Sequence, residues 1–296
     1  LGYYWDDWAF SWISQNLGDA GLAGYFATNR PVWGWLYRLT TPMLGAEPWA
    51  WQVFALFWRW LTGVAVWWLV RLLWPGQKNA ALWAGLLFVL YPAFTQQHIA
   101  ITYGHFFVVL TFFLTSLSLS IIAMRRQRLA WVAFLLALLL SAANLFMMEY
   151  FFILELLRPL VLWLAQETGA EKRLRRTLLR WLPYLAVFLA ALVWRAFFFP
   201  YQNENYESVL VQQLKTQPLA ALGTLILAVL RDLFTTTLAA WSRPFWIPNV
   251  SVLGRQTALV WAVLIVLSLA AFSIYLLKQP RRTSSESTRS DWKSML

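Results

Sequence analysis

Long apolar runs, most of them near the length that crosses a lipid bilayer, constrain the fold more than any other feature of this sequence. They lie at 50–73, 80–95, 104–124, 129–148, 150–166, 181–199, 219–239 and 258–277. The runs predict an all-α fold, a polytopic transmembrane helical bundle of about seven to eight spans, because a helix needs about 20 apolar residues to cross the hydrocarbon core. Two of the runs, 80–95 and 150–166, are short and would have to stand upright or borrow flanking residues.

The composition agrees with a membrane protein. Charged residues make up 12% of the chain, against about 25% in a typical soluble domain. The 21 tryptophans fit the enrichment of aromatic rings at membrane interfaces. The absence of cysteine excludes disulfides and thiolate metal sites. The net charge of +11 comes from short basic clusters between the apolar runs, which is how membrane topology is set, so we expect membrane lipids and no nucleic acid as partners.

The basic clusters predict which side of the membrane each loop faces. Clusters at 125–128, 171–180 and 278–282 should be cytoplasmic. Three predicted domains follow: an external loop with interfacial helices at 1–48, the helical bundle at 49–277, and a basic polar tail or linker at 278–296. The segments 96–103 and 200–218 and the turn near Glu149 then share the outer side with the first loop.

The alternation of sides fails after residue 199. If both 219–239 and 258–277 cross the membrane, the basic tail lands outside. We favour the interpretation in which 219–239 lies on, or dips into, the outer surface. The alternative leaves the tail outside, since the distribution of positive charge is a bias and not a law.

The first loop predicts two short interfacial helices. The stretch "WDDWAFSWISQNLG" can begin with Asp6 or Asp7 as its N-cap and end before Gly18. The stretch "NRPVWGWLYRLT" restarts the chain, with Asn29 as a possible cap and Pro31 at the first helical position. Tryptophan and tyrosine rings on both helices would dip into the headgroup region.

The adjacent acids Asp6 and Asp7 have a structural and a functional interpretation. In the first, one carboxylate caps a helix and the other sits in water near the positive helix end. In the second, the pair serves chemistry, because one acid is enough for a cap. An aromatic membrane surface also raises the pKa of a carboxylate, which suits a base or a metal ligand.

The pattern "YYWDDWAF…NRPVWGWLY", followed by "MMEYFFILELLRP" at 147–159, resembles membrane glycosyltransferases of the GT-C superfamily. In that group a paired acid follows the first transmembrane helix and precedes interfacial helices. The resemblance covers roughly residues 1–160 and depends on the position of the acid pair, because such a dipeptide alone is common. The first transmembrane helix is absent here, so we expect the chain to be a fragment. The resemblance implies a protein of the bacterial cytoplasmic (inner) membrane with its site facing outward.

The resemblance also implies the reaction and some of its residues. A sugar would pass from a polyprenyl-phosphate carrier to an acceptor, without a nucleotide. Asp7, slightly preferred, or Asp6 would be the base, and the other would orient it or ligate Mg²⁺ or Mn²⁺. Arg30 is the first candidate for binding the phosphate and Arg243 the second. The alternative for Arg30 is ordinary snorkelling at the interface.

Further polar residues on the predicted outer face are candidates for binding the sugar or phosphate. They are Gln96, Gln97, His98, Tyr103 and His105, together with Glu149 at an outer helix end. The alternative is a solvated loop and a surface acid. A metal site of two His and two Asp has no ligand spacing to support it.

Charges inside the apolar runs call for a different interpretation. Glu155 and Arg158, three residues apart, predict a structural ion pair. Arg59 and Arg195 should line the bundle interior or snorkel.

Two other function classes stay open. A transporter or flippase of a lipid-linked saccharide would place charges and broken helices near the membrane midplane, usually in repeated halves. A non-catalytic membrane scaffold would tolerate replacement of both Asp6 and Asp7.

Overall fold

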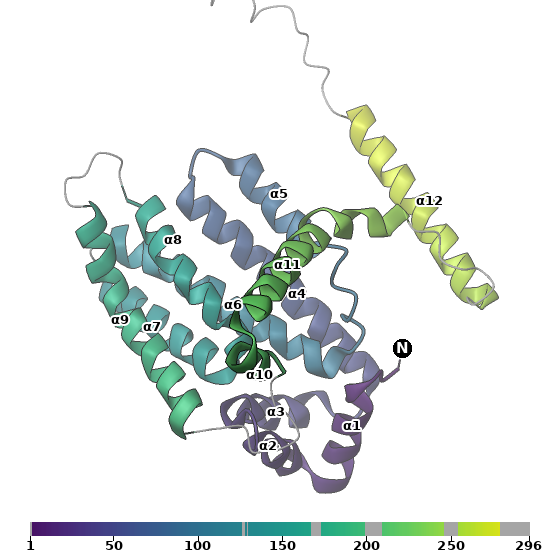
Figure 1. Cartoon of the computed structure of the whole chain (residues 1–296). Helices are drawn as coiled ribbons and strands as arrows, with labels where there is room; N and C mark the ends of the chain where they lie inside the picture. Colours follow the sequence, from purple (N-terminus) through teal and green to yellow (C-terminus); the bar gives the residue numbers. More distant parts are fainter. Residues whose placement is uncertain are drawn as a thin grey trace, which may run out of the picture. The chain divides into compact units, whose positions relative to one another are not determined.

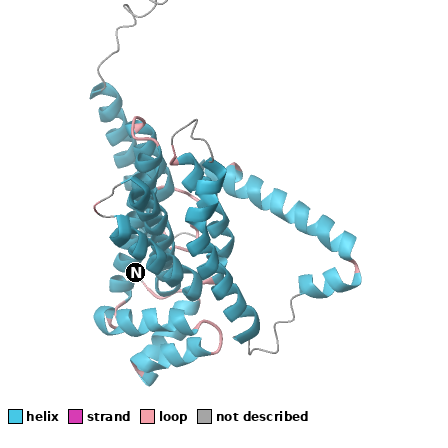
Figure 2. Cartoon of the chain, turned by 90° about the vertical axis from the view of Figure 1, so that its left-hand side faces the viewer, coloured by secondary structure: helices cyan, strands magenta, loops and turns pink. Residues whose placement is uncertain are grey.

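A computed structural model describes residues 2–125, 128, 130–166, 173–198, 209–245 and 254–278. Within these ranges the regular structure is helical and no strand occurs (Figures 1 and 2). The elements are α1 (Asp6–Leu17), α2 (Asp19–Ala27), α3 (Pro31–Leu44), α4 (Pro48–Leu73), α5 (Lys78–Val89), α6 (Ala100–Arg125), α7 (Ala130–Met147), η1 (Glu149–Leu157), α8 (Arg158–Leu164), α9 (Arg173–Val193), η2 (Trp194–Phe198), α10 (Val209–Thr216), α11 (Pro218–Thr237), η3 (Ala239–Phe245) and α12 (Arg255–Lys278).

Six helices in the described part of the chain are long and apolar enough to cross a membrane. They cover 48–73, 100–125, 130–147, 173–198, 218–237 and 258–275. Six of the predicted runs therefore correspond to such helices. The two short runs do not: α5 has only 12 residues, and 150–166 is divided between the 3₁₀ helix η1 and the seven-residue α8. Pro159 explains this division, because a proline disfavours continuation of the helix that precedes it.

Helix α6 forms the core of the bundle. In its most apolar window 56% of the residues are buried, against 28% or less in the other five candidate spans. It packs along α4 on one side and α7 on another, and α9 packs against α7. A helix surrounded in this way can bury polar groups, and α6 carries several.

The N-terminal helices α1, α2 and α3 gather at the end of the bundle where α6 begins (Figure 1). An aromatic cluster of Phe10, Phe26, Trp33 and Tyr37 holds them together, with ring centroids 4.7–5.8 Å apart. Several other rings of this region are exposed, Trp5, Trp8 and Trp12 among them. The exposed rings fit the predicted interfacial position, which stays a prediction.

The predicted helix caps of this region are wrong. Trp5, not an aspartate, is the N-cap of α1, and Arg30, not Asn29, is the N-cap of α3; neither cap makes a side-chain hydrogen bond. The aspartates lie one and two positions further along, inside the first turn of α1. Gly18 after α1 and Pro31 at the start of α3 are where the sequence predicts them.

Helix α11 projects away from the other helices along most of its length (Figure 2). Only Ala221 of its residues is buried. The Tyr91 hydroxyl donates a hydrogen bond to the Thr236 carbonyl near the end of α11. Helix α12 belongs to a separate unit, and its described side chains are almost all exposed. Residues 279–296 of the predicted tail and 200–208 of the predicted outer loop lie outside the described residues, as do 126–127, 171–172 and 279–282 of the basic clusters.

Candidate functional site

Asp7 binds the first turn of the central helix. Its side chain is fully buried, and its two oxygens accept three backbone hydrogen bonds. Oδ2 lies 2.7 Å from the Ala100 nitrogen, and Oδ1 lies 3.1 Å and 3.3 Å from the nitrogens of Ile101 and Thr102. The first N–H groups of a helix have no partner within the helix, and a carboxylate there also meets the positive end of the helix dipole. Asp7 therefore caps α6, from 93 residues away in the sequence.

The environment of Asp7 differs sharply from that of Asp6. Burial raises the pKa of Asp7 to about 6, although the three N–H donors lower it, and Asp6 raises it further. Asp6 is exposed on the same turn of α1. Asp6, Asp7 and Arg30 all interact electrostatically with the buried Tyr37 hydroxyl, whose pKa is raised well above its usual value, chiefly by burial. Asp7 is thus enclosed, and Asp6 is the accessible carboxylate of the pair.

A second group of charges brings α3, η1 and η2 together. Arg30 binds Glu149 through two bonds, with Nη2 2.5 Å from Oε1 and Nε 3.1 Å from Oε2. Arg195 approaches the same carboxylate, with Nη2 3.6 Å from Oε1, and donates to the Asn29 carbonyl. All three charged side chains are partly exposed, 13% for each arginine and 26% for Glu149. We call Arg30, Glu149 and Arg195 the arginine–glutamate cluster.

The backbone is irregular where two members of this cluster sit. Glu149 is the first residue of η1, a nine-residue 3₁₀ helix. Arg195 lies in η2, a π-helical segment that ends the long α9. Such 3₁₀ runs are rarely longer than about four residues, and π segments are frequent at functional sites. Glu149 and Arg195 therefore both lie where the backbone departs from a regular α-helix, as is common at functional sites.

Aromatic rings connect the two groups of charges. Tyr150 lies under the Arg30 guanidinium, 5.2 Å from ring centroid to the central carbon. Phe106 contacts Tyr150 and Tyr103, with centroids 5.7 Å and 5.2 Å apart. Tyr103 in turn interacts electrostatically with Asp6. Tyr150, Phe106 and Tyr103 thus form an aromatic strip beside the start of α6, with Arg30 over one ring and Asp6 within electrostatic range of another.

Gln97 lines a small cavity next to this strip. The cavity has a volume of about 120 Å³ and includes Gln96 and Tyr103 in its wall. Both polar atoms of the Gln97 amide are buried, and they find no hydrogen-bond partner in the part of the chain that the structure describes. A buried amide usually has a partner. A ligand hydroxyl or a water molecule of suitable position would provide one.

Of the remaining predicted site residues, only His105 contacts these groups, through the Tyr37 ring, with centroids 4.1 Å apart, within the described residues. His98 is exposed, and its ring packs edge-on against Tyr4. His105 is fully buried in α6, where its Nδ1 lies 2.7 Å from the Ile101 carbonyl oxygen and its Nε2 2.9 Å from the Thr40 hydroxyl. Arg243 is exposed in η3, and no described contact connects it to Asp6 or Arg30. The roles of all the predicted site residues stay predictions; Tyr103, Gln97, Arg30 and Glu149 are the candidates that lie around the aromatic strip.

Arg195 is the cluster member that the sequence analysis did not assign to the site, since it was expected to line the bundle interior or to snorkel. The sequence does contain a pattern that could have found Arg195, because the alternation of the spans puts the end of the run 181–199 on the same side as Glu149. The sequence could not identify Glu149 as the partner of Arg195, because the packing of α9 against α7 brings the two side chains together.

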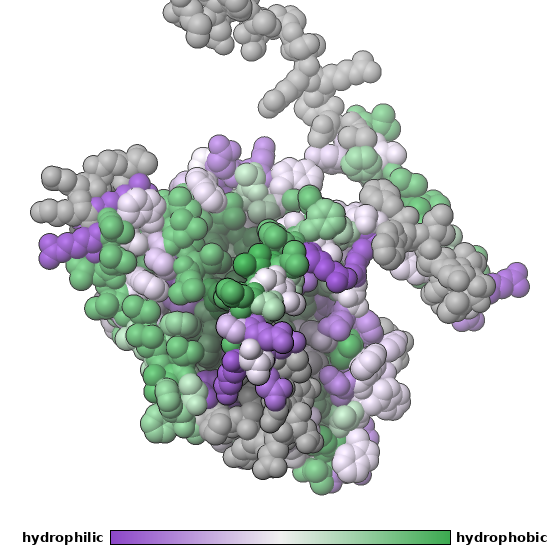
Figure 3. Space-filling view, in the orientation of Figure 1, coloured by the Kyte–Doolittle hydropathy of each residue, from purple (hydrophilic) through white to green (hydrophobic). Residues whose placement is uncertain are grey.

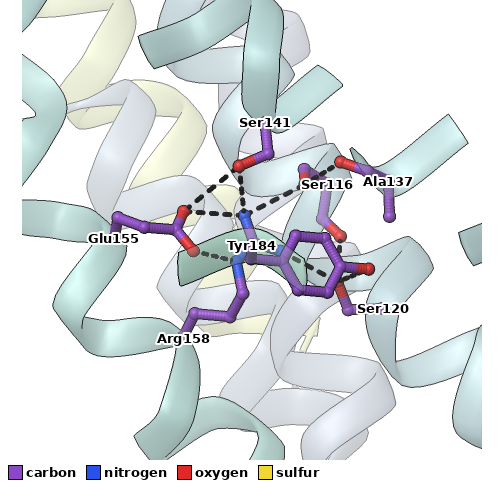
Figure 4. A network of polar contacts seen from close by, with 7 residues as sticks. All are labelled: Ser116, Ser120, Ala137, Ser141, Glu155, Arg158 and Tyr184. Carbon is purple, nitrogen blue, oxygen red and sulfur yellow. Dashed lines mark hydrogen bonds and ion pairs between the residues drawn. The ribbon is translucent and has the colours of Figure 1, made fainter. Parts of the chain in front are cut away.

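The predicted ion pair of Glu155 and Arg158 is confirmed and is part of a larger buried network (Figure 4). The Arg158 guanidinium donates to both Glu155 oxygens and to three serine hydroxyls, those of Ser116, Ser120 and Ser141. The Tyr184 ring lies 4.1 Å from the guanidinium carbon. The network thus joins η1 and α8 to α6, α7 and α9.

Within the described residues, no three His, Asp or Glu side chains come together as a metal site. The Asp7 oxygens already accept three N–H groups, so Asp6 is the member of the pair with freedom to bind Mg²⁺ or Mn²⁺. Comparison of the chain with protein families, characterised proteins and solved structures finds no match.

Proposed function

We propose that the chain belongs to an integral-membrane glycosyltransferase, resembling the GT-C superfamily, that transfers a sugar from a polyprenyl-phosphate carrier to an acceptor hydroxyl. One observation carries the proposal: beside the start of α6, the exposed Asp6 carboxylate interacts electrostatically with Tyr103 of the aromatic strip, and Arg30 lies over its Tyr150 ring and shares Glu149 with Arg195. A base and phosphate-binding cations are what this reaction requires.

Asp6 is the proposed base, in place of Asp7. Asp6 takes the proton of the acceptor hydroxyl, and the acceptor oxygen then bonds to the anomeric carbon of the sugar. The bond between that carbon and the phosphate oxygen breaks, and polyprenyl phosphate leaves with the electron pair. Asp7 acts as a positioning residue, because its bonds to Ala100 and Ile101 hold the first turn of α1 in place.

The two arginines are proposed to stabilise the departing phosphate. Guanidinium groups bind phosphate oxygens through paired hydrogen bonds. In the structure both guanidinium groups contact Glu149, so a phosphate would share or replace the Glu149 oxygens. Gln97 and Tyr103, at the wall of the neighbouring cavity, are proposed to hydrogen-bond the sugar.

A flippase of a lipid-linked saccharide is the second candidate function. The observation in its favour is the buried charge of Glu155 and Arg158 next to the interrupted helix formed by η1 and α8. Broken helices and intramembrane charges are typical of transporters. A flippase would move the lipid across a membrane without consuming the sugar linkage.

The test is transfer of a radiolabelled sugar from synthetic polyprenyl-phosphate sugar in membranes that contain the full-length gene product. We expect turnover with wild type, a loss of about 100-fold or more in Asp6→Asn, and unchanged turnover in Glu47→Gln. Glu47 is a matched control, since it is another exposed acid ahead of α4. Movement of the intact lipid without product would favour the flippase, and turnover unaffected by Asp6→Asn would refute the proposed base.

A further inference from the structure

A cavity separate from the candidate site lies where α6 ends and where α7 and α9 begin. Its volume is about 460 Å³, within the range of about 300–1,000 Å³ found for small-molecule sites. Its walls are mainly apolar and include Met124, Trp131, Phe134 and Leu179. The residues that line it come from α6, α7, α8 and α9, so the bundle itself forms this cavity.

The polar side of this cavity meets the buried network. Ser120 and Tyr184 both line the cavity, and the Ser120 hydroxyl donates to the Tyr184 oxygen at 3.1 Å. Ser120 also accepts a bond of 2.8 Å from Arg158 Nη1. The cavity therefore has a fixed polar floor and apolar walls.

Positive charge concentrates at the mouth. Residues 173–180 of α9 contain four arginines and no acid. The guanidinium group of Arg173 already has partners within the chain, because it donates hydrogen bonds to the Trp163 and Gln166 carbonyls. Arg180 lines the cavity, and Arg176 lies one turn before it on the same helix face. Both are exposed and make no hydrogen bond or ion pair within the described ranges.

The surface of α9 around these arginines is apolar. Leu174, Leu178 and Leu182 are exposed, and Figure 3 shows apolar surface along α9 with hydrophilic side chains at the end where the helix begins. A lipid-facing apolar surface that ends in arginines is the arrangement that places guanidinium groups at headgroup level.

We propose that this cavity and Arg176 and Arg180 form a binding site for an anionic phospholipid. The two guanidinium groups bind the headgroup phosphate, and one acyl chain enters the cavity between α7 and α9. Charge complementarity identifies the occupant, because a cavity with apolar walls and a doubly cationic mouth matches a negative headgroup joined to a hydrocarbon chain. The site is independent of the proposed sugar transfer.

The test is native mass spectrometry of the full chain during titration with phosphatidylglycerol, which distinguishes lipid classes and inorganic phosphate by mass. We expect the double variant Arg176→Gln/Arg180→Gln to weaken binding about tenfold or more. Ala123→Phe, which fills the cavity but keeps the charges, should also weaken it. The matched control Arg231→Gln/Arg255→Gln removes two exposed arginines elsewhere and should bind as wild type.

Three results would overturn the proposal. An equal loss of phosphatidylglycerol binding in the control variant Arg231→Gln/Arg255→Gln would mean that the net charge of the protein alone attracts the lipid. Equal binding of phosphatidylcholine would mean that the headgroup charge is not recognised. Unchanged phosphatidylglycerol binding in Ala123→Phe, together with binding of inorganic phosphate, would mean an anion site without a lipid chain. Thermal unfolding of each variant separates lost binding from lost folding.

Discussion

Asp6 and Asp7 are neighbours in sequence, but their side chains have different roles. Asp7 is buried and accepts three N–H groups of α6, whereas Asp6 is exposed. Removing the cap of a helix costs about 0.5–2 kcal/mol, and unsatisfied buried N–H groups add to that. We expect Asp7→Ala to lower the free energy of unfolding by about 1–3 kcal/mol and Asp6→Ala by less than about 0.5 kcal/mol.

Unfolding in detergent, followed by circular dichroism, measures both values. Equal destabilisation by the two variants would contradict the assignment of Asp7 as the cap of α6.

The raised pKa of Asp7 predicts a dependence of stability on pH. Its pKa is about 6 in the folded chain against 3.8 ordinarily, so the folded state holds the proton more tightly than the unfolded state. This contribution to stability is fully present below the ordinary value and is lost as pH rises through about 6. The free energy of unfolding should therefore fall more steeply from pH 4 to pH 7 in wild type than in Asp7→Asn. Parallel pH profiles would show that burial does not shift this carboxyl.

At the scale of elements, the buried network around Arg158 connects five segments of the bundle, η1, α6, α7, α8 and α9. Removing one member of a buried ion pair leaves an uncompensated charge and costs about 3–5 kcal/mol. We expect this loss in Arg158→Met, where the Glu155 carboxylate stays buried without its partner. The double variant Glu155→Gln/Arg158→Met should be less destabilised than the sum of its single variants. Additive losses in equilibrium unfolding would mean that the two side chains do not interact.

The pairing of α4 with α5 depends on close approach at two glycines. A Cβ at Gly85 would lie 2.9 Å from the Gly63 carbonyl oxygen and 3.0 Å from the Trp67 Cβ. Small residues at such crossings allow backbones in a membrane to approach closely. Gly85→Ala should therefore lower the free energy of unfolding by about 1–3 kcal/mol. Gly24→Ala is the control, because its Cβ would meet nothing within 4 Å; a similar loss there would refute the packing argument.

At the scale of the whole molecule, the sequence predicts where the helices lie in the chain better than it predicts which residues of different helices contact each other. Length and apolarity are local properties, so six predicted spans match long helices. The site depends on distant contacts: Asp7 reaches Ala100 across 93 residues, and Arg30 reaches Glu149 across 119. The predicted membrane side of each loop could place these residues on the same face of the protein. It could not show that Arg30 binds Glu149 or that Asp7 caps α6.

Asp6 is proposed to perform the chemistry, whereas Asp7 holds the start of α6. The most direct measurement is the rate of sugar transfer per folded protein for wild type, Asp6→Asn and Asp7→Asn, with lipid-linked sugar as the donor. We predict that Asp6→Asn loses about 100-fold or more at full folding, while Asp7→Asn loses activity only in proportion to the folded protein it loses. A fully folded Asp6→Asn variant that transfers sugar at the wild-type rate would contradict the account.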